Sequence, residues 1–77
     1  MNRTEAESLV IKWDTEALRR GRHDARKHLW RILDCLAGWR RYDAGVAAAL
    51  DELQQTPDVL TIRAICEKIV PDNGFKD

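Results

Sequence analysis

The stretch that decides the fold is DARKHLWRILDCLAGWRR, residues 24–41. At about 100° per residue, its apolar side chains cover one half of a helix and its polar side chains cover the other. The apolar half consists of Ala25, Leu29, Trp30, Ile32, Leu33, Leu36, Ala37 and Trp39, and the polar half of Asp24, Lys27, His28 and Arg31. An apolar arc of this width contacts more than one neighbour, so we expect 24–41 to be the central helix, with Leu33 and Leu36 in the core. Trp30 and Trp39 lie at the edges of the arc, where an amphipathic ring is partly buried and partly available to a partner.

The preceding segment predicts a helix over residues 5–20. Thr4 and Glu7 fit a capping box, in which the hydroxyl and the carboxylate each accept a backbone N–H of the other residue. Apolar residues follow at helical spacing, namely Ala6, Leu9, Val10, Trp13 and Ala17. Gly21 can adopt the left-handed conformation that ends a helix, and we expect Asp24 to cap the next one.

The remaining sequence predicts two shorter helices, over residues 44–55 and 58–70. Asp43 is the expected N-cap of the first. Thr56-Pro57-Asp58 is a start signal for the second, although Thr61 offers an alternative start. The inward faces are expected to consist of Val46, Ala47, Leu50 and Leu53, then Ile62, Ile65, Ile69 and Cys66 or Val70. Pro71 and Gly74 end the last helix, and residues 71–77 are expected to form a loose tail.

These patterns predict an all-α protein, a single domain over residues 1–77 built as a small bundle of three to four short helices. A chain of 77 residues buries a small core, so its stability margin is thin. Cys35 and Cys66 both lie in helical patterns and are interpreted as small, reduced core residues, with a disulfide as the less favoured alternative. With no other stabilising device in view, we expect the chain to form a homodimer.

The sequence contains no constellation typical of an enzyme, and we predict no catalytic activity, cofactor or metal. His28 and Cys35 are seven residues apart on one helix face, but tetrahedral zinc needs three or four ligands, usually in close pairs. No apolar run resembles a signal peptide or is long enough to span a membrane. A cytoplasmic location is the corresponding expectation.

The charge of the chain is zero overall but unevenly distributed. Residues 19–41 hold eight basic residues and two acidic ones, a local charge of +6 that the rest of the sequence balances. Three interpretations remain open for this segment. The bases could pair with acids of the neighbouring helices, dock an acidic protein surface together with the tryptophans, or contact nucleic-acid phosphates.

The residue types favour a protein partner. Trp, Tyr and Arg are enriched at binding hot spots, whereas dedicated nucleic-acid binders usually have a basic overall balance. The predicted function is binding of another protein, as an adaptor, a neutraliser or a mobile-element inhibitor, and the alternative is a DNA- or RNA-associated regulator that uses the same helix. The predicted partner-binding residues are Arg20, Arg26, Lys27, Trp30, Arg31, Trp39, Arg40 and Arg41.

A local resemblance supports the alternative. Residues 46–69, VAAALDELQQTPDVLTIRAICEKI, resemble the start of a tetracycline-repressor-type DNA-binding domain, and Thr61-Ile62-Arg63-Ala64-Ile65-Cys66 matches its second helix. That family continues with a turn and a recognition helix in the major groove. Residues 70–77, which contain Pro71 and Gly74, do not predict such a helix. The resemblance implies a pair of packed helices and carries over no functional residue.

Overall fold

A computed structural model describes residues 1–67 and 69, with every side chain among them except that of Trp39. The described part contains four α-helices and no strand, which confirms the all-α prediction. The helices are α1 (Arg3–Arg19), α2 (His23–Leu36), α3 (Ala44–Gln54) and α4 (Ile62–Cys66), with short 3₁₀ turns at Ala37–Trp39 and Val59–Thr61.

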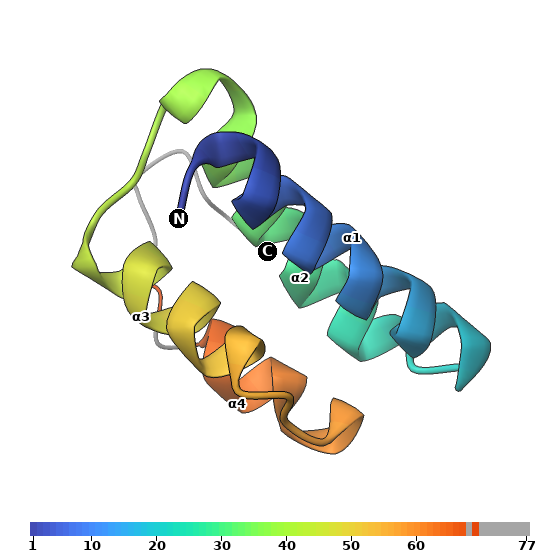
Figure 1. Ribbon diagram of the computed structural model, residues 1–77. Helices are drawn as coiled ribbons and strands as arrows, with labels where there is room; N and C mark the ends of the chain where they lie inside the picture. The colour runs from blue at the N-terminus through green and yellow to red at the C-terminus, as the bar shows by residue number, and fades with distance from the viewer. Residues whose placement is uncertain (68, 70–77) are drawn as a thin grey trace.

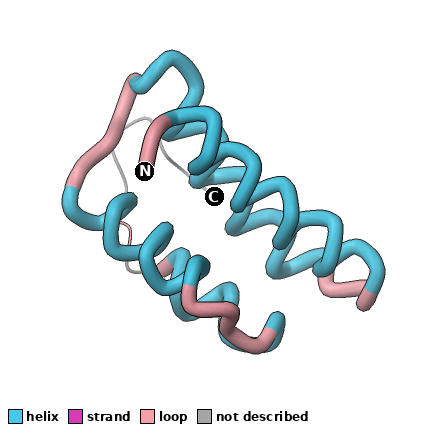
Figure 2. The backbone as a smooth tube through the Cα atoms, viewed as in Figure 1, coloured by secondary structure: helices cyan, strands magenta, loops and turns pink. Residues whose placement is uncertain are grey.

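The helices form a bundle in which each packs against two others. α1 and α2 lie side by side as an antiparallel hairpin, and α3 and α4 form a second, shorter pair (Figure 1). α1 also contacts α3, and α2 also contacts α4, so the core lies between the two pairs. An extended connection leads from the turn after α2 to the start of α3 (Figure 2).

The core consists largely of the apolar faces that the helical spacing predicts, but Ala49 is buried in α3 in place of the predicted Ala47, which is only partly buried, and Ala37 is exposed. α1 contributes Ala6, Val10, Trp13 and Ala17; α2 contributes Ala25, Leu29, Ile32, Cys35 and Leu36; α3 contributes Val46, Ala49, Leu50 and Leu53; Val59, Ile62, Ile65, Cys66 and Ile69 complete it. Leu36 is fully buried as predicted, whereas Leu33 is only partly buried at the edge of the core. Cys35 and Cys66 are buried free thiols, as their places in the helical patterns predict.

The end of α1 is as predicted, but its beginning is not. The helix starts two residues earlier than expected because Asn2, and not Thr4, is the N-cap, and its side-chain oxygen accepts the backbone N–H of Glu5 at 2.8 Å. At the other end Gly21 adopts φ +70°. The backbone N–H of Arg22 donates to the carbonyl of Ala17 at 2.8 Å, which is the hydrogen bond of a Schellman motif.

The predicted extent of the central helix is wrong at both ends. α2 begins at His23, and Asp24 lies within its first turn, where it binds the guanidinium of Arg22. The helix ends at Leu36 and not at residue 41, because Gly38 adopts φ +64° and reverses the chain. The backbone N–H of Arg41 then donates to the carbonyl of Cys35 at 3.0 Å, which satisfies one of the last helical carbonyls.

The buried face of α2 also differs from the prediction at one position. His28 is expected on the polar half of the helix but is only 8% exposed. His28 lies on the same side of the helix as buried Cys35, because seven residues make about two helical turns. α2 packs on α4 as well as on α1, so its buried surface extends to this side. With α4 as a second neighbour, α2 buries the polar residue His28 in addition to its apolar residues.

The C-terminal half confirms the predicted start of α3 but differs from the prediction beyond the end of that helix. Asp43 caps α3, accepting the backbone N–H of Val46 at 3.0 Å. Thr56 does not cap a helix, since it adopts φ +58° in the connecting turn. Asp58 instead caps the 3₁₀ turn, and α4 starts at Ile62, directly after the alternative start at Thr61. The predicted helix over 58–70 is therefore a 3₁₀ turn followed by a short α-helix. The expectations for Val70 and the tail 71–77 lie outside the described residues.

Candidate protein-binding surface

Most bases of the basic segment are paired with acids of this chain. At least six of its eight basic residues form an ion pair within 4.0 Å. The pairs are Arg19–Glu16, Arg20–Glu16, Arg22–Asp24, Arg26–Asp14, Arg40–Asp34 and Arg41–Asp43. Most join neighbours in sequence, and Arg26–Asp14 joins α2 to α1. Asp24 and Asp34 are already counted in the local charge of +6, and the other three acids, Asp14, Glu16 and Asp43, reduce it to +3.

Two acids within these pairs have strongly perturbed titration. Hydrogen bonds from Arg19 and then Arg20 lower the pKa of Glu16 to about 2. The hydrogen bond from Arg22 lowers the pKa of Asp24 to about 2. Both carboxylates are thus ionised at any physiological pH.

Trp30 is the predicted site residue that stands out in the folded chain. Its side chain is 56% exposed on the outer face of α2. Lys27 lies one turn before it and is exposed, while Leu33 lies one turn after it and is partly buried. Arg26 and Asp34 are its other neighbours one turn away. We call these five residues the Trp30 surface.

The ion pairs of Arg26 and Arg40 flank the Trp30 surface. Arg26 donates from Nε to Oδ1 of Asp14 at 3.0 Å, which holds its guanidinium toward α1. Arg40 donates from Nη2 to Oδ1 of Asp34 at 2.6 Å and so returns to α2 although it lies beyond the end of that helix. Both interactions hold guanidinium groups in defined positions, that of Arg26 toward α1 and that of Arg40 at Asp34, one turn after Trp30.

The other predicted site residues lie elsewhere. Arg20 is at the C-terminal end of α1, and its Nε donates to Glu16 at 2.9 Å. Arg31 lies on the flank of α2 toward α4, where its charge acts on the thiol of Cys66. Arg41 folds back onto Asp43 at the start of α3. The side chain of Trp39 is outside the described part of the structure. The fold therefore brings together Arg26, Lys27, Trp30 and Arg40 and separates the rest.

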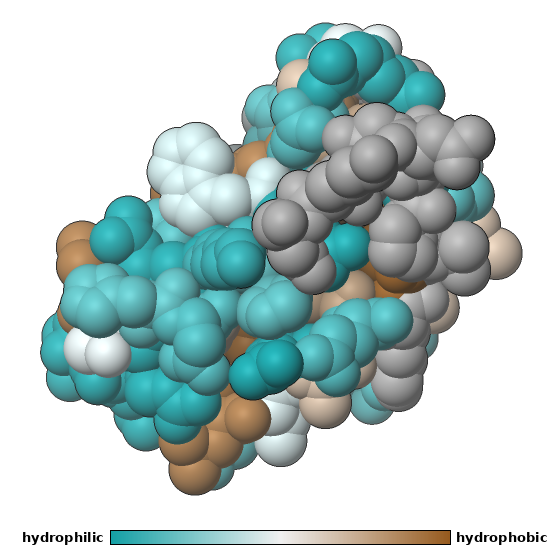
Figure 3. All heavy atoms as spheres, turned by 180° about the vertical axis from the view of Figure 1, so that it is seen from behind, coloured by the Kyte–Doolittle hydropathy of each residue, from teal (hydrophilic) through white to brown (hydrophobic). Residues whose placement is uncertain are grey.

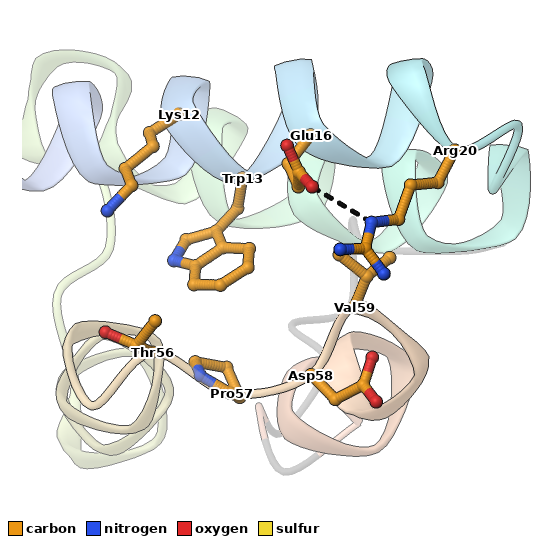
Figure 4. Close-up of a pocket in the computed structure, with 8 residues that line it drawn as sticks. All are labelled: Lys12, Trp13, Glu16, Arg20, Thr56, Pro57, Asp58 and Val59. Atoms are coloured by element: carbon orange, nitrogen blue, oxygen red, sulfur yellow. Dashed lines mark hydrogen bonds and ion pairs between the residues drawn. The ribbon is translucent and has the colours of Figure 1, made fainter.

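A second surface feature was not predicted. A groove of about 420 Å³ lies between α1 and the connection from α3 to the 3₁₀ turn. Figure 4 shows Trp13 projecting from α1 toward Pro57, with Lys12 and Arg20 on the α1 side and Asp58 on the opposite side. Two basic residues, Lys12 and Arg20, and two acidic residues, Glu16 and Asp58, line the groove, so its formal charges balance. The sequence gives no signal for it, because residues about forty positions apart form its two walls.

The surface seen from behind is predominantly hydrophilic. Figure 3 shows apolar residues there as small, separate patches among polar ones. The visible described residues on this side form no broad apolar area.

Metal and membrane sites have no support in the described residues. No cluster of three or more His, Cys, Asp or Glu side chains among residues 1–67 and 69 could hold a metal ion. In the same part of the chain, no helix has the length and apolar character needed to cross a bilayer. Burial raises the pKa of the Cys66 thiol to about 12, so this sulfur is protonated and is neither a ready ligand nor a nucleophile.

The chain matches no family model, and no curated protein or solved structure shows significant similarity to it. The local resemblance of residues 46–69 to a repressor domain therefore gains no support from these comparisons. The surface itself is the basis for a functional assignment.

Proposed function

We propose that this chain is a non-catalytic protein that binds another protein through the Trp30 surface. The observation that carries the proposal is the 56% exposure of Trp30 in a domain whose Trp13 is buried. A large ring left in water is costly to the free protein and gains free energy when a partner covers it. Tryptophan beside arginine is a typical composition of an interface hot spot.

The ion pairs favour a protein over a nucleic acid as the partner. Phosphate binding gains affinity by releasing counterions from bases that are available to the backbone. Arg26 and Arg40 are already paired with Asp14 and Asp34, so their contact with phosphate would have to compete with these carboxylates. On a protein partner the same pairs can remain intact and accept further hydrogen bonds at the rim of the interface.

Within this proposal the chain acts only by binding its partner, without catalysing a reaction. An adaptor, a neutraliser of a toxic protein and a mobile-element inhibitor all require a compact fold with one exposed recognition surface and no active site. We propose a cytoplasmic setting because the two free cysteines suit a reducing compartment. Self-association as a homodimer belongs to the same proposal.

The test begins with capture of a partner from native lysate, with and without nuclease treatment, followed by affinity measurements on the purified pair. Trp30→Ala should weaken binding by about 2 kcal/mol or more, roughly thirtyfold, with little dependence on salt. Leu60→Ala is the matched control, because Leu60 is also large, apolar and exposed but lies in the 3₁₀ turn before α4. Its affinity should equal that of the wild type.

Two outcomes contradict the proposal. A folded Trp30→Ala variant with unchanged affinity would remove the Trp30 surface from the interface. Capture that disappears on nuclease treatment, with affinity falling steeply as salt rises, would favour the nucleic-acid alternative.

A further inference from the structure

The outer face of α1 carries an uncharged stripe along its whole length. Its members are exposed residues separated alternately by four and three positions, namely Thr4, Ser8, Ile11, Thr15 and Leu18. Ile11 is 54% exposed and Leu18 is 50% exposed. We call these five residues the α1 stripe.

The spacing of the α1 stripe is that of positions a and d in a coiled coil. At about 100° per residue, the stripe lies opposite the buried face of Ala6, Val10, Trp13 and Ala17. A second helix laid along the stripe would therefore meet α1 from outside, with the rest of the domain on the far side. Two copies of the chain can approach through this stripe without contact between their cores.

The charges beside the stripe select a second copy in parallel orientation. The flanking positions are Glu7 and Asp14 on one side and Glu5, Lys12 and Arg19 on the other. In a parallel pair, position g of one helix faces position e of the next heptad on the other. Glu7 then faces Lys12 of the second copy, while Asp14 is held by Arg26 with its side chain only 16% exposed and takes no part. In an antiparallel pair position g faces position g, so Glu7 would face an acidic residue of the other copy, which is a repulsive contact.

These flanking charges already have partners within the chain. Glu7 accepts from Arg3 at 2.9 Å, Asp14 is held by Arg26, and Arg19 pairs with Glu16. The contacts to a second copy would extend these pairs at the rim of the helix pair. Their contribution is to orientation more than to affinity, and the apolar contacts of Ile11 and Leu18 supply the attraction.

A hollow in the surface near the N-terminal end of the α1 stripe is consistent with a second helix that packs along it. A shallow hollow of about 380 Å³ is lined by Met1, Thr4, Glu5 and Ser8, together with Leu9, Lys12 and Gln54. Thr4, Glu5 and Ser8 occupy positions d, e and a of α1, which are three of the four positions around a d-position side chain in a parallel two-stranded coil. Because α1 is already held in helical form by the core, pairing does not have to offset the cost of forming the helix.

We infer that the chain forms a parallel homodimer through the α1 stripe. This rests on the self-association within the proposed function and is independent of Trp30. The stripe of one copy meets the stripe of the other about a two-fold axis, so each residue of the stripe lies near its own counterpart. The Trp30 surface belongs to α2 and is not part of this contact.

Sedimentation equilibrium on the full chain is the first measurement. We expect a mass of twice 8.9 kDa at micromolar concentration. Ile11→Asp with Leu18→Asp should weaken association at least a hundredfold. Leu60→Asp is the matched control and should leave it unchanged, because Leu60 is exposed on another element. A wild-type monomer throughout this range would overturn both this inference and the proposed self-association.

Charge exchange tests the orientation. Glu7→Lys should weaken a parallel dimer about fivefold or more, and adding Lys12→Glu should restore it, because the Glu7–Lys12 attraction is re-formed with exchanged signs. In an antiparallel dimer Glu7→Lys would instead strengthen association, because it would remove the repulsion between acidic residues at facing g positions. Melting curves of both variants monitor the loss of the Arg3–Glu7 pair within the helix.

A disulfide test locates the contact. Ser8→Cys should give a covalent dimer under mild oxidation, since the two copies of residue 8 lie close together only in the parallel arrangement. Ala64→Cys, exposed on α4, is the control and should remain monomeric in denaturing gels, and native Cys35 and Cys66 are buried. A dimer that sediments normally but shows no Ser8→Cys linkage would overturn the α1 stripe as the interface while leaving self-association standing.

Discussion

Trp13 in α1 and Trp30 in α2 lie on neighbouring helices, yet the first is 5% exposed and the second 56%. The indole Nε1 of Trp13 donates to the carbonyl of Leu53 at 3.0 Å, which ties α1 to the end of α3. Trp30 lies on the outer face of α2, away from the core. The same residue type therefore stabilises the fold in one place and is available for recognition in the other. The face of the helix decides between these roles.

The largest expected effect separates the two tryptophans by stability. Trp13→Ala should lower the free energy of unfolding by about 3–5 kcal/mol, since it creates a cavity and leaves the Leu53 carbonyl without its donor. Trp30→Ala should change it by less than about 0.5 kcal/mol. Urea denaturation followed by circular dichroism measures both. Equal losses would show that Trp30 is also part of the core.

A smaller contrast separates two leucines of α2. Leu36 is fully buried, so Leu36→Ala should cost about 2–5 kcal/mol. Leu33 is only partly buried toward the Trp30 surface, so Leu33→Ala should cost about half as much or less. The comparison of urea midpoints tests whether the core ends where the Trp30 surface begins, and a larger loss at Leu33 would contradict it.

The buried thiol of Cys66 predicts a pH dependence of stability. Burial raises the pKa of Cys66 from 9.0 to about 12, so the unfolded chain loses this proton before the folded one does. The contribution of Cys66 is complete below pH 9 and is lost as pH rises toward 12, at up to about 1.4 kcal/mol per pH unit. Thermal melts from pH 8 to about 11 should show this slope in the wild type but not in Cys66→Ala, which controls for the other groups that titrate there. Parallel curves would contradict the prediction.

The smallest effect concerns the ion pairs beside Trp30. Arg26 and Asp14 are mostly buried between α1 and α2, with side chains 28% and 16% exposed. A double-mutant cycle of Arg26→Met and Asp14→Asn should therefore give a coupling of about 1 kcal/mol. The Arg40–Asp34 pair is exposed, and the corresponding cycle should give a coupling near zero. Chemical denaturation at low and high salt measures both, and the reverse order would show that Arg26 is not held by Asp14.

The sequence by itself determined the helical class, the buried stripe of α1, that of α3 except for Ala47 and Ala49, and the ends marked by Gly21 and Asp43. These features depend on spacing and on backbone conformations that a few local residues dictate. Gly21 is recognisable as a helix end because the apolar pattern also pauses there. Gly38 adopts the same left-handed conformation, but it lies between the apolar residues Ala37 and Trp39. The apolar pattern of α2 therefore continues past Leu36 in the sequence, and the end of the helix cannot be recognised from it.

The tertiary structure alone decided which charges and rings remain at the surface. The pairing of Arg26 with Asp14 depends on how α1 lies against α2, and the return of Arg40 to Asp34 depends on the turn at Gly38. His28 is buried because α4 adds a second neighbour to α2. The exposure of Trp30, and with it the proposed binding surface, depends on the same packing. Helical periodicity places side chains around one axis, whereas burial depends on how many neighbours pack against that axis and at which angle.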